Sequence, residues 1–322
     1  MSEYGLNAGI ALGFQNSYGT ANVASLHFVP FLNEDVGIDQ PPLISENLTG
    51  VFDEAQDFSG PRTVGGNLAC DAHPLSVGMM ISAVLGVAST QAVDSAFQHA
   101  WQPNVADFDI FAANKPVTYY KDLGVGSAMI FQDLVGATLE LAIANGELTK
   151  CTVGFMGGQL SQQAAISKAL PTGRPRWPWN VASVSVGGSA VPELQALTVT
   201  VDQSLEASHT INASLYPSRV KRGGFRTVAV EGTIFFDTQA HYQSFLNETE
   251  QNLTVFLKGA TEIASGYTED MTIILPAFRY REFKPVAEGP TQIAVSFTSA
   301  GKYHQNSATA LEIILVNTQA AY

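Results

Sequence analysis

The chain has 322 residues, of which 46% are hydrophobic and 10% aromatic, and its formal net charge at pH 7 is −13. This length suits one large domain or two of ordinary size, and the composition is that of a globular protein. The acidic balance argues against a protein that grips nucleic acid, because phosphate contacts require concentrated Lys and Arg. The longest apolar run, residues 78–88, is too short to span a bilayer, so no membrane association is expected.

Most of the chain alternates between apolar and polar residues with a period of two. In residues 196–202 one face carries Leu and Val, and the other carries Thr and Asp. Residues 137–144, 149–155 and 291–297 follow the same rule. This alternation is typical of half-buried antiparallel strands, with one face in a core and the other facing water or a partner. The sequence therefore predicts a mainly β protein.

Two stretches depart from this alternation and predict helices. They are residues 73–86 and residues 237–250. The first begins with Pro74 at the N1 position and ends at Gly86, which are typical start and stop signals. The second offers Asp237 or Thr238 as its N-cap. Each predicted helix directly follows one of two related hexapeptides.

The two hexapeptides indicate an internal duplication. "GNLACD" at 66–71 and "GTIFFD" at 232–237 share the opening Gly, the central apolar residues and the closing Asp, and they are 166 residues apart. Farther on, "CTVGF" at 151–155 matches "IAVSF" at 293–297 with an offset of 142. The first half therefore contains a larger middle segment, at about residues 87–128.

A proline-rich segment, "PTGRPRWPWN" at 171–180, lies between the halves and disfavours regular structure. We therefore predict a first domain at 1–170, a linker at 171–180 and a second domain at 181–322. Within the linker, Trp177 and Trp179 are expected to anchor the segment onto the folded body. Cys70 and Cys151 are expected to be small core residues.

The sequence contains no recognisable catalytic or ligand motif. The zinc-protease H-E-x-x-H, paired C-x-x-C, P-loop and G-x-S-x-G patterns are all absent, and the six His residues are scattered. We therefore predict no catalytic residue, no cofactor and no metal site, and we do not expect an enzyme.

The strand patterns carry a resemblance to a known family. Residues 9–37, with "YGT" at 18–20, residues 61–86 and residues 136–158 resemble the tail tube proteins of tailed bacteriophages. The resemblance implies a small β-sandwich or curled sheet with one flanking helix in each domain. It further implies that such domains join into a ring whose inner sheet is a closed β-barrel. Stacked rings form the hollow tail through which DNA travels from capsid to host.

The resemblance and the repeat together predict how the chain assembles. Two tube domains per chain give a homotrimeric ring with pseudo-sixfold symmetry. The resemblance also implies contacts with the tape measure, terminator and baseplate proteins, passage of double-stranded DNA without specific binding, and a virion tail protein that is synthesised in the host cytoplasm. Two alternatives are a baseplate or distal tail adaptor with the same fold, and a soluble β-sandwich binding module.

Two sets of residues are predicted to matter for assembly and DNA passage. The small polar faces suit a wet channel wall, and the predicted lumen-facing residues are Glu140, Thr198, Thr200, Asp202, Glu231 and Thr233. Loop 33–61 is acidic and the corresponding loop 203–226 is basic, which favours contact between the two kinds of domain. The predicted inter-subunit or inter-ring residues are Glu34, Asp35, Asp39, Glu46, Asp53, Glu54, Asp57, Arg219, Lys221, Arg222 and Arg226.

Overall fold

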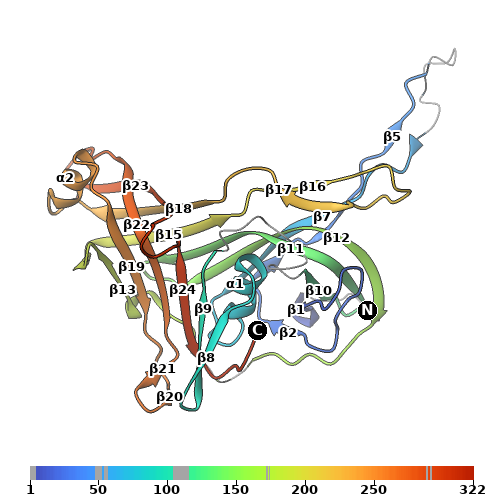
Figure 1. The fold of residues 1–322 in the computed structure, drawn as a ribbon, viewed down its shortest axis with the longest axis horizontal. Coiled ribbons are helices and arrows are strands. Elements are labelled where there is room, and N and C mark those ends of the chain that lie inside the picture. The colour runs from blue at the N-terminus through green and yellow to red at the C-terminus, as the bar shows by residue number, and fades with distance from the viewer. Residues whose placement is uncertain are drawn as a thin grey trace.

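The computed structural model consists mostly of antiparallel β-strands and describes residues 5–47, 53, 57–103, 116–171, 173, 175–287, 289–290 and 292–322. Its central sheet takes strands from both halves of the chain (Figure 1). In spatial order these strands are β7 (Thr63–Asp71), β12 (Lys150–Ala164), β11 (Ser127–Ala144), β15 (Leu194–Asp202), β18 (Thr227–Phe235), β23 (Ala294–Gly301) and β22 (Met271–Phe283). The mainly β prediction is confirmed, and the described strands of a single chain form no closed barrel.

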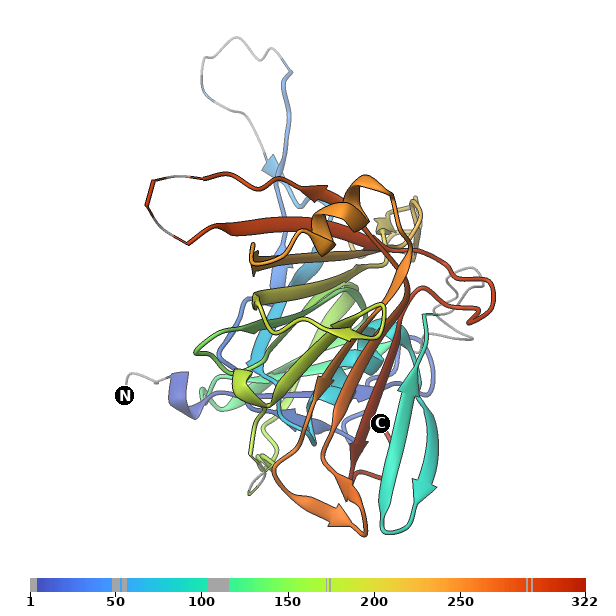
Figure 2. The same cartoon turned by 90° about the vertical axis from the view of Figure 1, so that its left-hand side faces the viewer.

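Two long strands carry the chain from the central sheet into a second layer, because each changes its pairing partner along its length. The first part of β11 pairs with β10 (Val117–Asp122), which continues to β1 (Gly9–Phe14) and β2 (His27–Val29). The first part of β22 pairs with β19 (Gln251–Leu257), which continues to β13 (Ala182–Val186) and β14 (Ser189–Ala190). The core is enclosed between these folded layers (Figure 2).

The middle segment of the first half contributes to the sheet of the second half. It contains the hairpin of β8 (Ser89–Val93) and β9 (Ala96–Trp101), and β9 pairs with β24 (Glu312–Asn317), which pairs with β22. The larger segment expected at about 87–128 therefore holds this hairpin and also β10, a strand of the first half. Residues 104–115 of this segment lie outside the described part of the chain.

Short strands form projections from this body. β3 (Asn33–Glu34) and β4 (Gly37–Asp39) pair with β7 at the edge of the central sheet. Three hairpins extend beyond the sheet, and they are β5 (Leu43–Ile44) with β6 (Asp57–Phe58), β16 (Leu205–Ser208) with β17 (Arg219–Arg222), and β20 (Glu262–Ala264) with β21 (Tyr267–Thr268). The β5–β6 and β16–β17 hairpins, which we call the two arms, project at the same end of the molecule (Figure 1).

The first predicted helix is present, but it is shorter than the sequence pattern indicates. α1 (Val77–Leu85) begins after Ser76, so the prediction that Pro74 occupies N1 is wrong. The residues before the helix form a turn instead, in which the N–H groups of Ser76 and Val77 both donate to the carbonyl of His73. Gly86 ends the helix as predicted, with φ of 95° and its N–H bonded to the carbonyl of Ser82.

The second predicted helix is also shorter. α2 (Ala240–Leu246) has Gln239 at its N-cap, so neither Asp237 nor Thr238 caps it. Tyr242 and Phe245 pack against the core, whereas 52% of Leu246 is exposed. The described residues also form two short 3₁₀ helices, η1 (Gly5–Asn7) and η2 (Trp179–Val181).

Trp177 anchors the proline-rich segment to the folded body, as predicted, whereas the Trp179 side chain is 46% exposed. Trp177 is buried, and its indole Nε1–H donates to the carbonyl of Glu269 at 2.9 Å. The backbone N–H of Trp179 donates to the carbonyl of Glu147 at 3.0 Å. Cys70 and Cys151 are buried free thiols on opposite residues of β7 and β12, which confirms that they are core residues.

The opening glycine of each hexapeptide lies where the backbone of a neighbouring strand passes closely. A Cβ on Gly66 would come within 2.6 Å of the backbone of Asp35 and Val36, and Gly66 has φ of +139°. A Cβ on Gly232 would come within 2.8 Å of the backbone carbonyl of Ala196 and within 2.6 Å of the Phe297 ring. Neither position has room for a side chain.

We expect Gly66→Ala and Gly232→Ala each to lower the free energy of unfolding by about 1–3 kcal/mol, because overpacking a core forces backbone or ring shifts of this cost. Gly5→Ala is the matched control, since nothing lies within 4 Å of the Cβ position there. Urea unfolding of the three purified variants measures the difference. Equal stability of all three would show that the close approaches are relieved without cost.

Candidate functional site: a polar sheet face between two open edges

The central sheet has one apolar face and one polar face, because its strands alternate with period two. Leu139 and Leu141 of β11 and Val199 and Val201 of β15 point into the core and are at most 3% exposed. Both helices belong to this apolar side, since their side chains pack within the same core. The polar face lies opposite, and its exposed and partly exposed side chains are available to a partner or to water.

The sheet brings all six predicted lumen residues together on this polar face. They lie on three adjacent strands, β11, β15 and β18, and residues directly opposite on neighbouring strands share a face. The relevant opposite pairs are Glu140 with Thr200, Thr198 with Glu231, Thr138 with Asp202, and Ala196 with Thr233. Glu140 and Glu231 are exposed, and the other four predicted residues are partly exposed. The six residues therefore share one face of the sheet, while their position in a lumen stays a prediction.

The charged residues of the polar face are mostly acidic. In strands β7, β12, β11, β15, β18 and β23 the charged residues on this face are Asp71, Glu140, Lys150, Asp202 and Glu231. The one ammonium among them, Lys150, forms an ion pair with Glu147 at the end of the β11–β12 hairpin. Asp202 also closes a turn, since its Oδ1 accepts the N–H of Ser204 at 2.7 Å. On these six strands the face therefore presents mostly carboxylates, and β22 adds Arg279, opposite Ala300, and Glu282, opposite Thr298.

The acidic loop is only partly a free surface. The Glu34 carboxylate is mostly buried and forms an ion pair with Lys121 at 2.8 Å. It also accepts the hydroxyl of Tyr119 at 3.4 Å, and burial together with the Glu34 charge raises the pKa of that tyrosine. The Asp35 carboxylate accepts the backbone N–H of Asn67. The described acids that remain exposed in this loop are Asp35, Asp39, Glu46, Asp53 and Asp57, and the predicted Glu54 lies outside the described residues.

The basic loop forms the β16–β17 arm. Arg219 and Lys221 are exposed on β17, whereas Arg222 is half-buried and donates to Oε1 of Gln203 at 3.0 Å. Burial, together with the nearby charge of Arg222, lowers the pKa of Arg226 to about 10. The base of the arm packs on β11 through Leu205 and Val220.

The acidic and basic loops lie side by side at one end of the same chain. The N–H of Arg62 donates to the carbonyl of Leu215, and its guanidinium lies 5.4 Å from the centre of the Tyr216 ring and donates to its hydroxyl. The ion pairs that the structure gives for the described residues join neither Arg219 nor Lys221 to the acidic loop. The predicted contact between these loops in neighbouring domains therefore stays a prediction.

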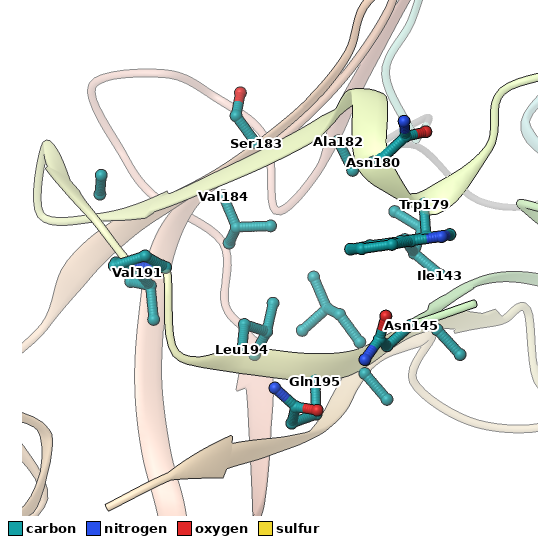
Figure 3. A pocket seen from close by; sticks show the side chains of 15 residues that line it. Ile143, Asn145, Trp179, Asn180, Ala182, Ser183, Val184, Val191, Leu194 and Gln195 are labelled. Carbon is teal, nitrogen blue, oxygen red and sulfur yellow. The ribbon is translucent and has the colours of Figure 1, made fainter. Parts of the chain in front are cut away.

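A pocket of about 440 Å³ lies at the opposite end of β15, between β13, β14 and the last residues of β11 (Figure 3). Trp179 stands beside Ile143 at one side of it, and Val184 and Leu194 face each other across it. Its polar lining side chains are amides and a hydroxyl, and none is titratable. Such a lining can cover an apolar group, but it offers no acid, and no base to activate the Ser183 hydroxyl as a nucleophile.

The described residues contain neither a metal-binding cluster nor a membrane-spanning helix. No group of three or more His, Cys, Asp or Glu side chains in the described part of the chain is arranged to hold a metal ion. Among the described residues no helix is long and apolar enough to cross a membrane.

Sequence reasoning missed two features that flank the polar face. One is the outer edge of β3 and β4, and the other is the end of β22 with its exposed Arg281 and Lys284. The alternating pattern identifies strands, but it does not tell which strand is left without a neighbour.

These features define an antiparallel β-sheet protein with a broad acidic face and open sheet edges of the kind that pair with other chains. Residues 5–299 match the family described as phage tail tube protein, and the chain belongs to this family. No curated protein matches the chain significantly. The resemblance found in the strand patterns is thereby confirmed. The chain is a structural component of a bacteriophage tail, in a family that self-assembles into a tube and associates with other tail proteins.

Proposed function

We propose that the protein forms closed rings that stack into the hollow tail tube, and that double-stranded DNA passes through this tube from capsid to host without specific binding. The observation that carries the proposal is the polar face, on which Glu140, Asp202 and Glu231 lie together on three adjacent strands. A wall rich in carboxylates and hydroxyls stays hydrated, and it does not exchange counterions for phosphate contacts as Lys and Arg would. DNA can therefore slide along it.

Duplication of a tube domain supports the ring. In this proposal residues 1–170 and 181–322 are two copies of one unit, and each contributes four neighbouring strands to the wall. The first copy contributes β3 with β4, β7, β12 and β11, and the second contributes β15, β18, β23 and β22. Closing these edges into a barrel removes the unpaired strand edges that a single chain exposes.

The two ends of the wall differ, which supports stacking in one direction. The arms project beyond the Asp202 end of β15, whereas the pocket beside Trp179 lies at the Leu194 end. Two rings stacked head to tail bring arms against pockets, and such a heterologous contact continues without limit. The tape measure, terminator and baseplate proteins then act as the further partners of the tube, which is assembled in the host cytoplasm.

We expect the purified protein to form rings or hollow tubes in electron micrographs. Their end-on views should show a central hole. A sample that stays monomeric at all concentrations, with ligand bound beside Trp179, would support a soluble binding module instead. Rings that bind only the tip of preformed tubes, and never polymerise, would support a distal tail adaptor.

A further inference from the structure

The two halves of the chain pair their strands in the same register. Gly66 of β7 lies opposite Phe155 of β12, and Gly232 of β18 lies opposite Phe297 of β23. The next inward-facing pairs also correspond, and they are Leu68 with Val153 and Ile234 with Val295. By this register, β11 of the first half corresponds to β22 of the second half. In the same way β15 corresponds to the segment 33–39, because β15 pairs with β18 and the segment 33–39 pairs with β7.

One junction between the halves is present inside the chain. Residues 138–144 of β11 pair antiparallel with residues 196–202 of β15 over seven consecutive positions. This junction joins the last strand of the first half to the first strand of the second half. It is an example, within one chain, of how the sheet of one half pairs with the sheet of the other half.

The corresponding edges at the two ends of the central sheet are open. In the part of the chain that the structure describes, residues 33–39 pair with β7 on one side, and no strand pairs with their other side. Residues 279–283 of β22 pair with β23 alone, and the described residues from 284 to 293 form no strand. Unpaired strand edges are templates for pairing with another chain.

The charges at the two open edges are complementary. Arg281 and Lys284 are exposed at the end of β22, where Glu282 is the neighbouring acid. Asp35 and Asp39 are exposed on the edge beside β7. Opposite charges on facing edges steer encounter and help to fix the register of a contact.

We infer that residues 284–287 of one subunit pair antiparallel with residues 35–39 of the next subunit, and so repeat between chains the junction that β11 and β15 form within one. This inference rests on the proposed ring. The partner is a second copy of the chain, and residues 284–287 become strand when the ring closes.

The register of the contact follows from the internal junction, in which Glu140 lies opposite Thr200. Thr200 lies opposite Ala229 of β18. The repeat relates β18 to β7 with an offset of 166 residues, so Ala229 corresponds to Thr63, and Thr63 lies opposite Asp39. Asp39 therefore corresponds to Thr200.

The partner of Asp39 follows in the same way. Glu140 lies opposite Thr152 of β12. The repeat relates β12 to β23 with an offset of 142 residues, so Thr152 corresponds to Ala294. Phe283 lies opposite Phe297, so extending that hairpin by three residues sets Val286 opposite Ala294. Val286 is 46% exposed in the single chain. The contact therefore places Val286 of one subunit opposite Asp39 of the next.

A cysteine pair tests this contact in assembled tubes. Directly opposite residues in antiparallel strands have Cα atoms about 4.5–5.5 Å apart, which falls within the range that a disulfide bridges. We expect D39C/V286C tubes, treated with oxidised glutathione, to give covalent species of up to three chains on non-reducing gels. D39C/E262C is the matched control, since Glu262 lies on the β20–β21 hairpin away from both edges, and it should stay monomeric on the gel.

The outcomes separate this inference from the proposed function. Intact D39C/V286C tubes without disulfides would overturn the strand contact and leave the tube standing. Wild-type protein that never forms rings would overturn the proposed function itself. A second pair of variants serves if the cysteines disturb folding. R281E/K284E should raise the protein concentration needed for rings, and D39K added to it should lower that concentration again. No rescue by D39K would contradict the inferred contact.

Discussion

Phages that carry E140K/E231K in the tube protein are expected to assemble complete tails but to deliver DNA poorly. Both side chains lie on the open polar face, where a change of charge disturbs no packing, and surface substitutions of this kind usually alter stability by less than about 0.5 kcal/mol. In a three-chain ring the double variant places six ammonium groups on the wall. The DNA affinity of a protein that makes six or more phosphate contacts falls by about 10³-fold or more as salt rises, which shows how much such contacts contribute at low salt. Because every ring of the variant tube repeats these six groups, the tube is expected to hold DNA strongly.

Infectivity per assembled particle measures this effect, and tail length in electron micrographs verifies assembly. E250K/E262K is the matched control, because it makes the same change in charge at exposed positions outside the polar face. Purified variant tubes should also retain duplex DNA at low salt and release it as salt rises, since Debye screening shortens from ~10 Å at about 0.1 M to ~3 Å at about 1 M. Normal DNA delivery through variant tails would show that the two carboxylates face away from the path of the DNA.

The polar face could be predicted because its information is local. Thr198, Thr200 and Asp202 share a face in any strand of period two, whatever its neighbours are. The related hexapeptides likewise mark positions at which a glycine is required, at Gly66 and Gly232, where a neighbouring strand passes closely. Each of these features is written in a few consecutive residues.

Other features depend on residues distant in the sequence, and local patterns did not reveal them. The charge of the acidic loop predicts that all its acids serve contacts between domains, but the fold brings Lys121 to Glu34 and buries the pair. The first helix lost its expected start at Pro74 because the carbonyl of His73 accepts two backbone N–H groups and forms a separate turn. The pairing of β9 with β24 joins residues more than 200 positions apart, which no periodicity reports.

Rings of this protein are expected to contain three whole chains, which means threefold symmetry with six similar domains. Each chain offers eight neighbouring wall strands when β3 and β4 are taken as one, so three chains supply 24. Two chains would give 16 strands, and a barrel of that size encloses an aqueous channel rather than a space for a DNA duplex. With a strand spacing of about 4.8 Å and a tilt of about 40°, 24 strands form a backbone ring about 48 Å in diameter.

Native mass spectrometry of isolated rings measures the chain number directly. One chain has a mass of 34.3 kDa, so a trimer has 3 × 34.3 kDa, or about 103 kDa. End-on averages from electron microscopy should then show six similar lobes, whose alternate members differ because the β8–β9 hairpin is added to the sheet of the second half alone. Six chains per ring, with true sixfold symmetry, would mean that one chain supplies a single wall segment. In that case the correspondence of β11 with β22, and of β15 with residues 33–39, would have no role in assembly.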